Sequence, residues 1–346
     1  MFESLPFLAA TYVGQPVWLW IAFLAFIAFL LWIDLGVVNN KDGVVSAKKS
    51  AAMWASFASM AIAFGAYVYF VYEPDPRYYM SPDNLNQQAV LQYFTGYLLE
   101  TALAFDNIFV IGMIFTFFAV PRQYQHRVLF WGILGVIVLR AIMIGIGATL
   151  VAEFGWVLYL FAGFLILTGI KMLAFGDKEM DLAANPVLKF VRRRFRVTDE
   201  LHGERFLVKL PDPKTGKLVR YMTPLFLALI LIEIADVIFA VDSVPAIFAI
   251  TTDPYIVYTS NIFAILGLRA LYFALAAVLH RFAYLKQALA VLLIFIGSKI
   301  FVADLLGLTK FPPAWSLGVT FAILASGIAY SLWRTRNPVP TLTGES

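Results

Sequence analysis

Two strongly apolar stretches of the sequence contain side chains whose oxygen atoms could bind a cation. These side chains belong to Glu100, Asp106, Asn107, Glu233, Asp236, Asp242 and Ser243. In each stretch two acids lie six positions apart, and a small polar residue follows the second acid. Carboxylate, amide and hydroxyl oxygens suit Mn²⁺, Ca²⁺ and Mg²⁺ better than Zn²⁺ or copper ions. The seven residues are therefore predicted to bind a divalent cation, with Mn²⁺ the first expectation and Ca²⁺ and Mg²⁺ left open.

The composition indicates that these stretches lie in a membrane. Hydrophobic residues make up 61% of the 346 residues and charged residues only 14%, whereas a soluble domain is about half apolar. A chain in lipid needs no polar exterior, so membrane insertion explains the deficit of charge. The sequence has no cysteine, which excludes disulfides and thiolate chemistry. The net charge of +4 gives no indication of nucleic-acid binding.

Apolar runs of about 20 residues are long enough to cross a bilayer as helices. Nine such runs are predicted, at 17–38, 51–72, 92–118, 128–150, 156–175, 224–250, 256–279, 287–306 and 315–333. We therefore expect an all-α polytopic membrane protein with about nine transmembrane helices, forming one transmembrane domain over 1–346. The long loop 176–222 is basic, and alternating apolar runs around a Pro and Gly turn predict a β-hairpin in it.

The lysines and arginines in the loops predict how the chain crosses the membrane. Nearly all of them fall in loops on one side of the nine runs, whereas Arg77 and Lys310 lie on the other side. Cytoplasmic loops carry the excess of basic residues, so the N-terminus is predicted outside and the C-terminus in the cytoplasm. We expect a multi-pass protein of the bacterial plasma (inner) membrane, with loop 176–222 lying against anionic headgroups of the lipid bilayer.

The sequence contains an internal repeat. Three helices in 92–175 match three helices in 223–306: the acid pair recurs in the first helix, Leu-Arg-Ala in the second and Gly-x-Lys in the third. Because each unit has an odd number of helices, the second unit crosses the membrane in the opposite direction. The pattern predicts a 3+3 inverted repeat, which is typical of secondary transporters with a binding site near the middle of the membrane.

Acids inside membrane helices need compensation, since each costs about 2.5–3.5 kcal/mol at mid-helix. Arg140, Lys171, Arg269 and Lys299 are expected to pair with acids rather than contact substrate. The acids outnumber these bases, so a divalent cation is expected to neutralise the excess, and protons are a candidate coupling ion. Residues six apart point about 120° away from each other on a helix, so one site holding every acid requires a bend, which Pro245 could allow.

The motifs LETALAFDNIFVIGMIF, from Leu99 to Phe115, and YMTPLFLALILIEIADVIFAVDSVPAIFAIT, from Tyr221 to Thr251, resemble those of the TerC family and, within it, of the Alx-like proteins. The resemblance covers nearly the whole chain. It implies a fold of the LysE-like superfamily and a link to manganese export, to metal delivery to secreted enzymes and, in some members, to tellurite resistance. Many members have Ser at the position of Ala104 and Thr at that of Ala235, so two hydroxyls are missing here.

The expected function is export of Mn²⁺ by a secondary transporter, without enzymatic activity or a cofactor. The sequence has no G-x-x-x-x-G-K-[ST] loop, so an ATP-driven pump is not expected. Three alternatives remain open: transport of Ca²⁺ or another divalent cation, an intramembrane metal-dependent hydrolase, and a membrane scaffold or metal-delivery partner that binds secretion machinery.

Overall fold

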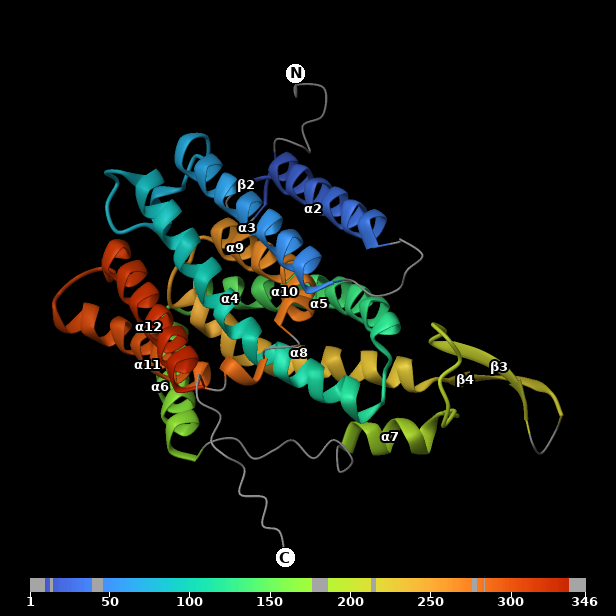
Figure 1. The fold of residues 1–346 in the computed structure, drawn as a ribbon. Coiled ribbons are helices and arrows are strands. Elements are labelled where there is room, and N and C mark those ends of the chain that lie inside the picture. The colour runs from blue at the N-terminus through green and yellow to red at the C-terminus, as the bar shows by residue number, and fades with distance from the viewer. Residues whose placement is uncertain are drawn as a thin grey trace, which may run out of the picture.

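The computed structural model describes residues 10–12, 15–38, 46–175, 186–212, 216–275, 279–282 and 284–335. Within these residues the protein is a helical bundle, and eight segments are long and apolar enough to cross a membrane (Figure 1). They are α3 (Ala47–Phe70), α4 (Leu85–Phe117), α5 (Arg122–Glu153), α6 (Val157–Phe175), α8 (Pro224–Phe248), the pair α9 (Pro254–Leu266) and α10 (Leu268–Leu275), α11 (Leu285–Leu305) and α12 (Pro313–Arg334). The protein is thus an all-helical, multi-pass membrane protein.

Each of the nine predicted apolar runs coincides with a helix. The first corresponds to α2 (Val17–Val38), whose described apolar part, Val17–Ile33, is shorter than the eight candidate spans. The seventh run is divided into two helices, because α9 ends at Leu266 and α10 begins at Leu268. Short elements complete the fold: β1 (Thr11–Tyr12), β2 (Gln15–Pro16), η1 (Pro76–Tyr78) and η2 (Leu279–Phe282).

The span formed by α9 and α10 lies at the centre of the bundle. In its membrane-length window 94% of the residues are buried, against 22% for α3 and for α12. Helix α4 packs along α9, α5 packs along α8, and α6 packs along α11. The outer helices therefore present their apolar side chains outward, as lipid requires, and the polar residues of the inner helices are enclosed by protein.

Side-chain caps fix where two of the inner helices begin. Thr223 accepts a hydrogen bond from the backbone N–H of Phe226, and Pro224 occupies the first turn of α8. Asp253 accepts from the N–H groups of Tyr255 and Ile256 at the start of α9. Each cap satisfies donors that a helix N-terminus leaves free.

Helices α6 and α11 pack through glycines in a reciprocal manner. A Cβ atom at Gly169 would lie 2.6 Å from the backbone oxygen of Ala290, and one at Gly297 would lie 2.6 Å from that of Ala162. Both helices therefore approach each other at a position where only glycine fits. Ala162 and Ala290 are as far apart in the sequence as Gly169 and Gly297 are.

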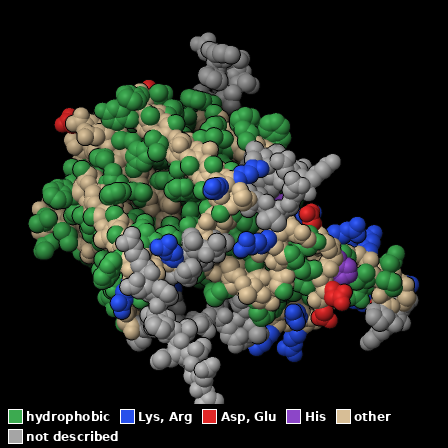
Figure 2. Space-filling view, viewed as in Figure 1, with side chains coloured by type: hydrophobic (Ala, Val, Ile, Leu, Met, Phe, Trp, Pro, Cys, Tyr) green, Lys and Arg blue, Asp and Glu red, His purple; other side chains and the backbone are tan. Residues whose placement is uncertain are grey.

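The β-hairpin predicted in loop 176–222 is confirmed. Strand β3 (Leu207–Pro211) pairs antiparallel with β4 (Leu218–Met222), with Leu207 opposite Met222. The loop also contains helix α7 (Pro186–Arg194), which was not predicted. The hairpin projects from the bundle beside α7 (Figure 1). In the view of Figure 2, lysine and arginine side chains lie across the middle and lower parts of the molecule, including the end with the hairpin and α7, whereas the upper left is mainly hydrophobic.

Candidate functional site

A buried ion pair joins the first two helices of the predicted repeat. Both guanidinium Nη atoms of Arg140, on α5, donate to the carboxylate of Glu100, on α4, at 2.7 and 3.0 Å. Arg140 is 1% exposed and Glu100 is 3% exposed. Such a two-pronged contact is the strongest arrangement of this kind of pair. The expected pairing of an intramembrane base with an acid is therefore found here.

Arg140 also binds the polar groups of two other helices. One Nη atom donates to the hydroxyl of Ser243 on α8 at 2.7 Å and to the side-chain oxygen of Asn261 on α9 at 2.9 Å. One residue thus ties α4, α5, α8 and α9 together. Glu100 and Ser243, both predicted as cation ligands, are here hydrogen-bond acceptors of Arg140.

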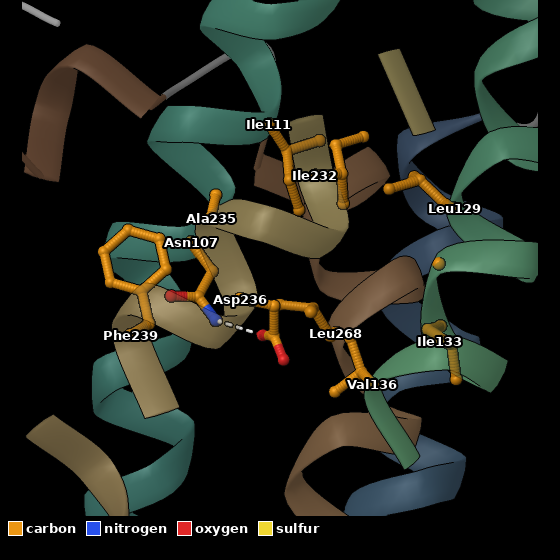
Figure 3. Close-up of a pocket in the computed structure, with 11 residues that line it drawn as sticks. Asn107, Ile111, Leu129, Ile133, Val136, Ile232, Ala235, Asp236, Phe239 and Leu268 are labelled. Carbon is orange, nitrogen blue, oxygen red and sulfur yellow. Dashed lines mark hydrogen bonds between the residues drawn. The ribbon is translucent and has the colours of Figure 1, made fainter. Parts of the chain in front are cut away.

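Asn107 and Asp236 form a second polar contact between α4 and α8. The side-chain N–H of Asn107 donates to one oxygen of Asp236 at 3.4 Å (Figure 3). The other oxygen of Asp236 and the amide oxygen of Asn107 are buried and, among the described residues, have no hydrogen-bond partner. Because buried oxygens without a donor are costly, a cation or a water molecule at this position would stabilise the protein.

A small cavity of about 20 Å³ lies beside these two side chains. This is room for about one water molecule. Apart from Asn107 and Asp236 its lining is apolar, and Figure 3 shows Ile133 and Val136 of α5 and Leu268 of α10 on the side opposite Asn107. Among the described residues that line the cavity, Asn107 of α4 and Asp236 of α8 are thus the ones whose side-chain oxygens could bind a dehydrated ion.

Glu233 extends this polar group along α8. It precedes Asp236 by three residues, and one of its carboxylate oxygens is buried without a hydrogen-bond partner in the described part of the chain. Its other oxygen lies over Gly135 of α5, where an added Cβ atom would come within 2.2 Å of it. Glycine at position 135 therefore provides the space that the Glu233 carboxylate occupies.

Asp106 and Asp242 belong to a second polar group. Asp242 accepts a hydrogen bond from the Thr168 hydroxyl of α6 at 3.4 Å and interacts electrostatically with Lys171. Asp106 interacts electrostatically with Asp242 and with Lys286 at the start of α11. Lys171 thus lies near an acid, as expected for the intramembrane bases.

The structure therefore distributes the seven predicted ligands over two groups. Helix α8 continues through Pro245 to Phe248, so no unwinding brings its two aspartates to one face. Among the described residues, no three His, Cys, Asp or Glu side chains lie close enough together to hold a metal ion. In this conformation the first group offers two carboxylates, Glu233 and Asp236, and the amide oxygen of Asn107.

Several residues that shape these groups were not predicted from the sequence. Asn261 supplies an acceptor to Arg140, Thr168 supplies a donor to Asp242, and Gly135 makes room for Glu233. One signal was available: Thr259, Ser260 and Asn261 form a polar run inside an otherwise apolar span. Polar residues inside membrane helices usually face the interior of the protein.

Comparison with known proteins gives the family of the chain. The model of the family described as integral membrane protein TerC matches residues 85–338. The chain is 46% identical over 315 residues to a membrane protein of Rickettsia felis, covering 91% of this chain and 97% of that one. It is 44% identical over 323 residues to a protein of Escherichia coli K12 named "Putative membrane-bound redox modulator Alx", covering 93% and 96% respectively. No solved structure matches. The chain belongs to the TerC family of integral membrane proteins.

Proposed function

We propose that this protein is a secondary transporter that exports Mn²⁺ across the bacterial plasma membrane through a carboxylate site in the middle of the bundle. The observation that carries the proposal is that Glu233, Asp236 and Asn107 each have a buried oxygen with no hydrogen-bond partner among the described residues. The cavity beside Asn107 and Asp236 has room for about one water molecule or one dehydrated metal ion. Intramembrane acids are costly and generally mark an ion pathway.

The charges of this group favour a divalent ion. Arg140 already neutralises Glu100, so the charge of that acid is balanced without a bound ion. Glu233 and Asp236 together carry two negative charges when ionised, which one divalent cation balances. Carboxylate and amide oxygens are ligands that Mn²⁺ accepts readily. Release of the ion leaves two carboxylates that can take up protons, which is how proton coupling would operate.

The inverted repeat predicted from the sequence would support an alternating-access mechanism. The reciprocal glycine contacts of α6 and α11 agree with a two-fold relation between residues 92–175 and 223–306. The packing of α4 on α9 and of α5 on α8 agrees with it as well. Under this proposal one repeat rocks against the other and exposes the site first to the cytoplasm, then to the outside. The N-terminus lies outside and the C-terminus in the cytoplasm.

Polar residues of α4 and α8 make corresponding contacts, which is consistent with such a relation. Asn107 of α4 donates to Asp236 of α8, while Ser243 of α8 and Glu100 of α4 share the guanidinium of Arg140. Each small polar residue thus contacts the first acid of the other helix or shares Arg140 with it.

The proposal is tested by intracellular manganese in cells that lack their own exporter. Wild type, Asp236→Asn and Glu233→Gln are expressed at matched levels, with Asp83→Asn as an exposed carboxylate control. Wild type and Asp83→Asn are expected to lower intracellular manganese, and the two site variants are expected to fail. If wild type lowers calcium instead, the substrate is corrected. If all variants behave alike, the site is wrong and the scaffold alternative gains support.

Asp106→Asn and Asp242→Asn are measured in the same cells to place the second group. Loss of export in these variants means that the ion passes both groups. Retained export means that only the first group binds the ion. An intramembrane hydrolase predicts cleavage of a membrane substrate that depends on Asp236 while manganese levels stay unchanged. A partner of the secretion machinery predicts function that survives all four substitutions.

A further inference from the structure

A second, larger cavity lies at the end of the bundle that carries the loops 249–253 and 306–312. Its volume is about 380 Å³, and it lies between α4, α6 and α11. This is within the range of small-molecule sites in proteins. Gln92, which lines it, is two helical turns before Glu100 on α4, or about 12 Å along the helix axis. The cavity is therefore separate from the carboxylate group described above.

The polar lining of this cavity includes a buried lysine with a neutral partner. Lys299 is 4% exposed, and its ammonium donates to the hydroxyl of Ser316 at 2.9 Å. Among the described residues no carboxylate lies within ion-pair distance of it. The expected pairing of this lysine with an intramembrane acid is thus not found. A buried ammonium without a counter-charge is costly, so an anion beside it would be stabilising.

The other charged groups around the cavity have partners of their own. Lys310 donates to the backbone oxygen of Tyr78 and to the hydroxyl of Thr252, both neutral acceptors. The carboxylate of Asp304 accepts from the hydroxyl of Tyr159 at 2.7 Å. Lys310 also interacts electrostatically with the carboxylate of Asp253. Among the described residues, Lys299 is therefore the ammonium of this lining that has no acid paired with it.

The side chain of Gln92 provides a further polar contact for a ligand. It is 4% exposed, and its amide oxygen is buried without a hydrogen-bond partner among the described residues. A ligand that carries both an anionic oxygen and a hydroxyl would satisfy Lys299 and this oxygen together. Hydrogen phosphate has both groups on one phosphorus atom, and phosphatidylglycerol has an anionic phosphodiester beside the hydroxyls of its headgroup glycerol.

We propose that this cavity binds one oxyanion of the phosphate class through the ammonium of Lys299 and the amide of Gln92. Lys310 also lines the cavity. The oxyanion can come from two sources, free inorganic phosphate or the phosphate of an anionic lipid headgroup. The site is independent of the cation site, so its test does not depend on transport.

Binding is measured on the purified full-length protein in detergent. One arm titrates inorganic phosphate by isothermal calorimetry, and the other measures bound phosphatidylglycerol by native mass spectrometry. One of the two probes is expected to bind at one per chain. Lys299→Met is expected to lower its affinity at least about tenfold, because a hydrogen bond to a charged group is lost. Lys209→Met, an exposed lysine of the hairpin, is the matched control and is expected to bind normally.

Gln92→Leu provides a second variant that removes no charge and is useful where Lys299→Met folds poorly. It is expected to weaken the same probe by about tenfold, since the hydrogen-bonding amide is lost. Binding of phosphate identifies the free ion as the source, and binding of phosphatidylglycerol alone identifies a lipid headgroup. The proposal is overturned if neither probe binds, or if the folded variants bind as tightly as wild type.

Discussion

Replacement of Arg140 by methionine tests the buried ion pair that organises the bundle. Methionine replaces the aliphatic part of the arginine side chain and carries no charge, so the change removes the guanidinium and leaves the Glu100 carboxylate buried without its partner. Removal of one partner of a buried pair typically costs about 3–5 kcal/mol. The hydrogen bonds to Ser243 and Asn261 are lost at the same time, which places the expected cost in the upper half of that range.

The assay is thermal or denaturant unfolding of the purified protein in detergent, arranged as a double-mutant cycle. Arg140→Met and Glu100→Gln are each expected to destabilise the protein by several kcal/mol. The double variant is expected to be more stable than Arg140→Met alone, because no unpaired charge remains in the interior. Arg127→Met serves as the control, since its ion pair with Glu204 is largely exposed and such pairs contribute about 0–1 kcal/mol.

The reasoning is refuted if the effects of the two single substitutions simply add in the double variant. Additive effects would mean that Arg140 and Glu100 act independently, so that the contact contributes no coupling energy. A cost for Arg140→Met as small as that of Arg127→Met would equally contradict the assignment of a buried, compensated pair.

Three further predictions follow from contacts in the bundle. Gly135→Ala is expected to lower manganese export about tenfold or more, because the added methyl group displaces the Glu233 carboxylate. Gly145→Ala on the same helix has open space around it and is expected to export normally; equal export by both variants would contradict the placement of Glu233. Gly169→Ala is expected to lower the free energy of unfolding by about 1–3 kcal/mol, because the added Cβ atom clashes with the backbone of Ala290. Gly163→Ala, whose Cβ atom has no neighbour within 4 Å, is the control; an unchanged unfolding free energy in Gly169→Ala would argue against the close approach of α6 and α11. Burial raises the pKa of the Asp253 carboxyl, opposed by hydrogen bonds from Tyr79 and Tyr72, so the stability that it contributes is complete below its unfolded pKa of about 4 and is lost as the pH rises through the folded pKa. Asp253→Asn is expected to remove this fall of Tm with rising pH. An unaltered curve of Tm against pH would contradict a raised pKa for the buried Asp253 carboxyl.

The helices and the hairpin could be predicted because their signals are local. A run of about 20 apolar residues has few alternatives to a spanning helix, since lipid offers no partner for free backbone groups. The alternation around the Pro and Gly turn in loop 176–222 similarly indicates a hairpin. Helix α7 was missed because nine residues with a triple arginine carry no membrane signal. The division of the seventh run after Leu266 was also missed, although Gly267 stands at that position.

The arrangement of the acids could be predicted only in part. Spacing of six residues places Asp106 about 120° from Glu100 on a helix, and the structure keeps this separation rather than bending a helix to remove it. Which base meets which acid depends on how α4, α5 and α8 cross, and sequence spacing does not contain that information. For the same reason Asn261 could be recognised as a buried polar residue but not as a partner of Arg140.

The most direct test of the central claim is Mn²⁺ flux in proteoliposomes that contain the purified protein and a manganese-sensitive dye. Wild type is expected to move Mn²⁺ down an imposed gradient, and Asp236→Asn is expected to reduce the flux to that of empty liposomes because the buried carboxylate of the site is gone. Asp83→Asn is expected to transport like wild type. Equal flux through wild type and Asp236→Asn, or no flux of Mn²⁺ through reconstituted and folded wild type, would contradict the account.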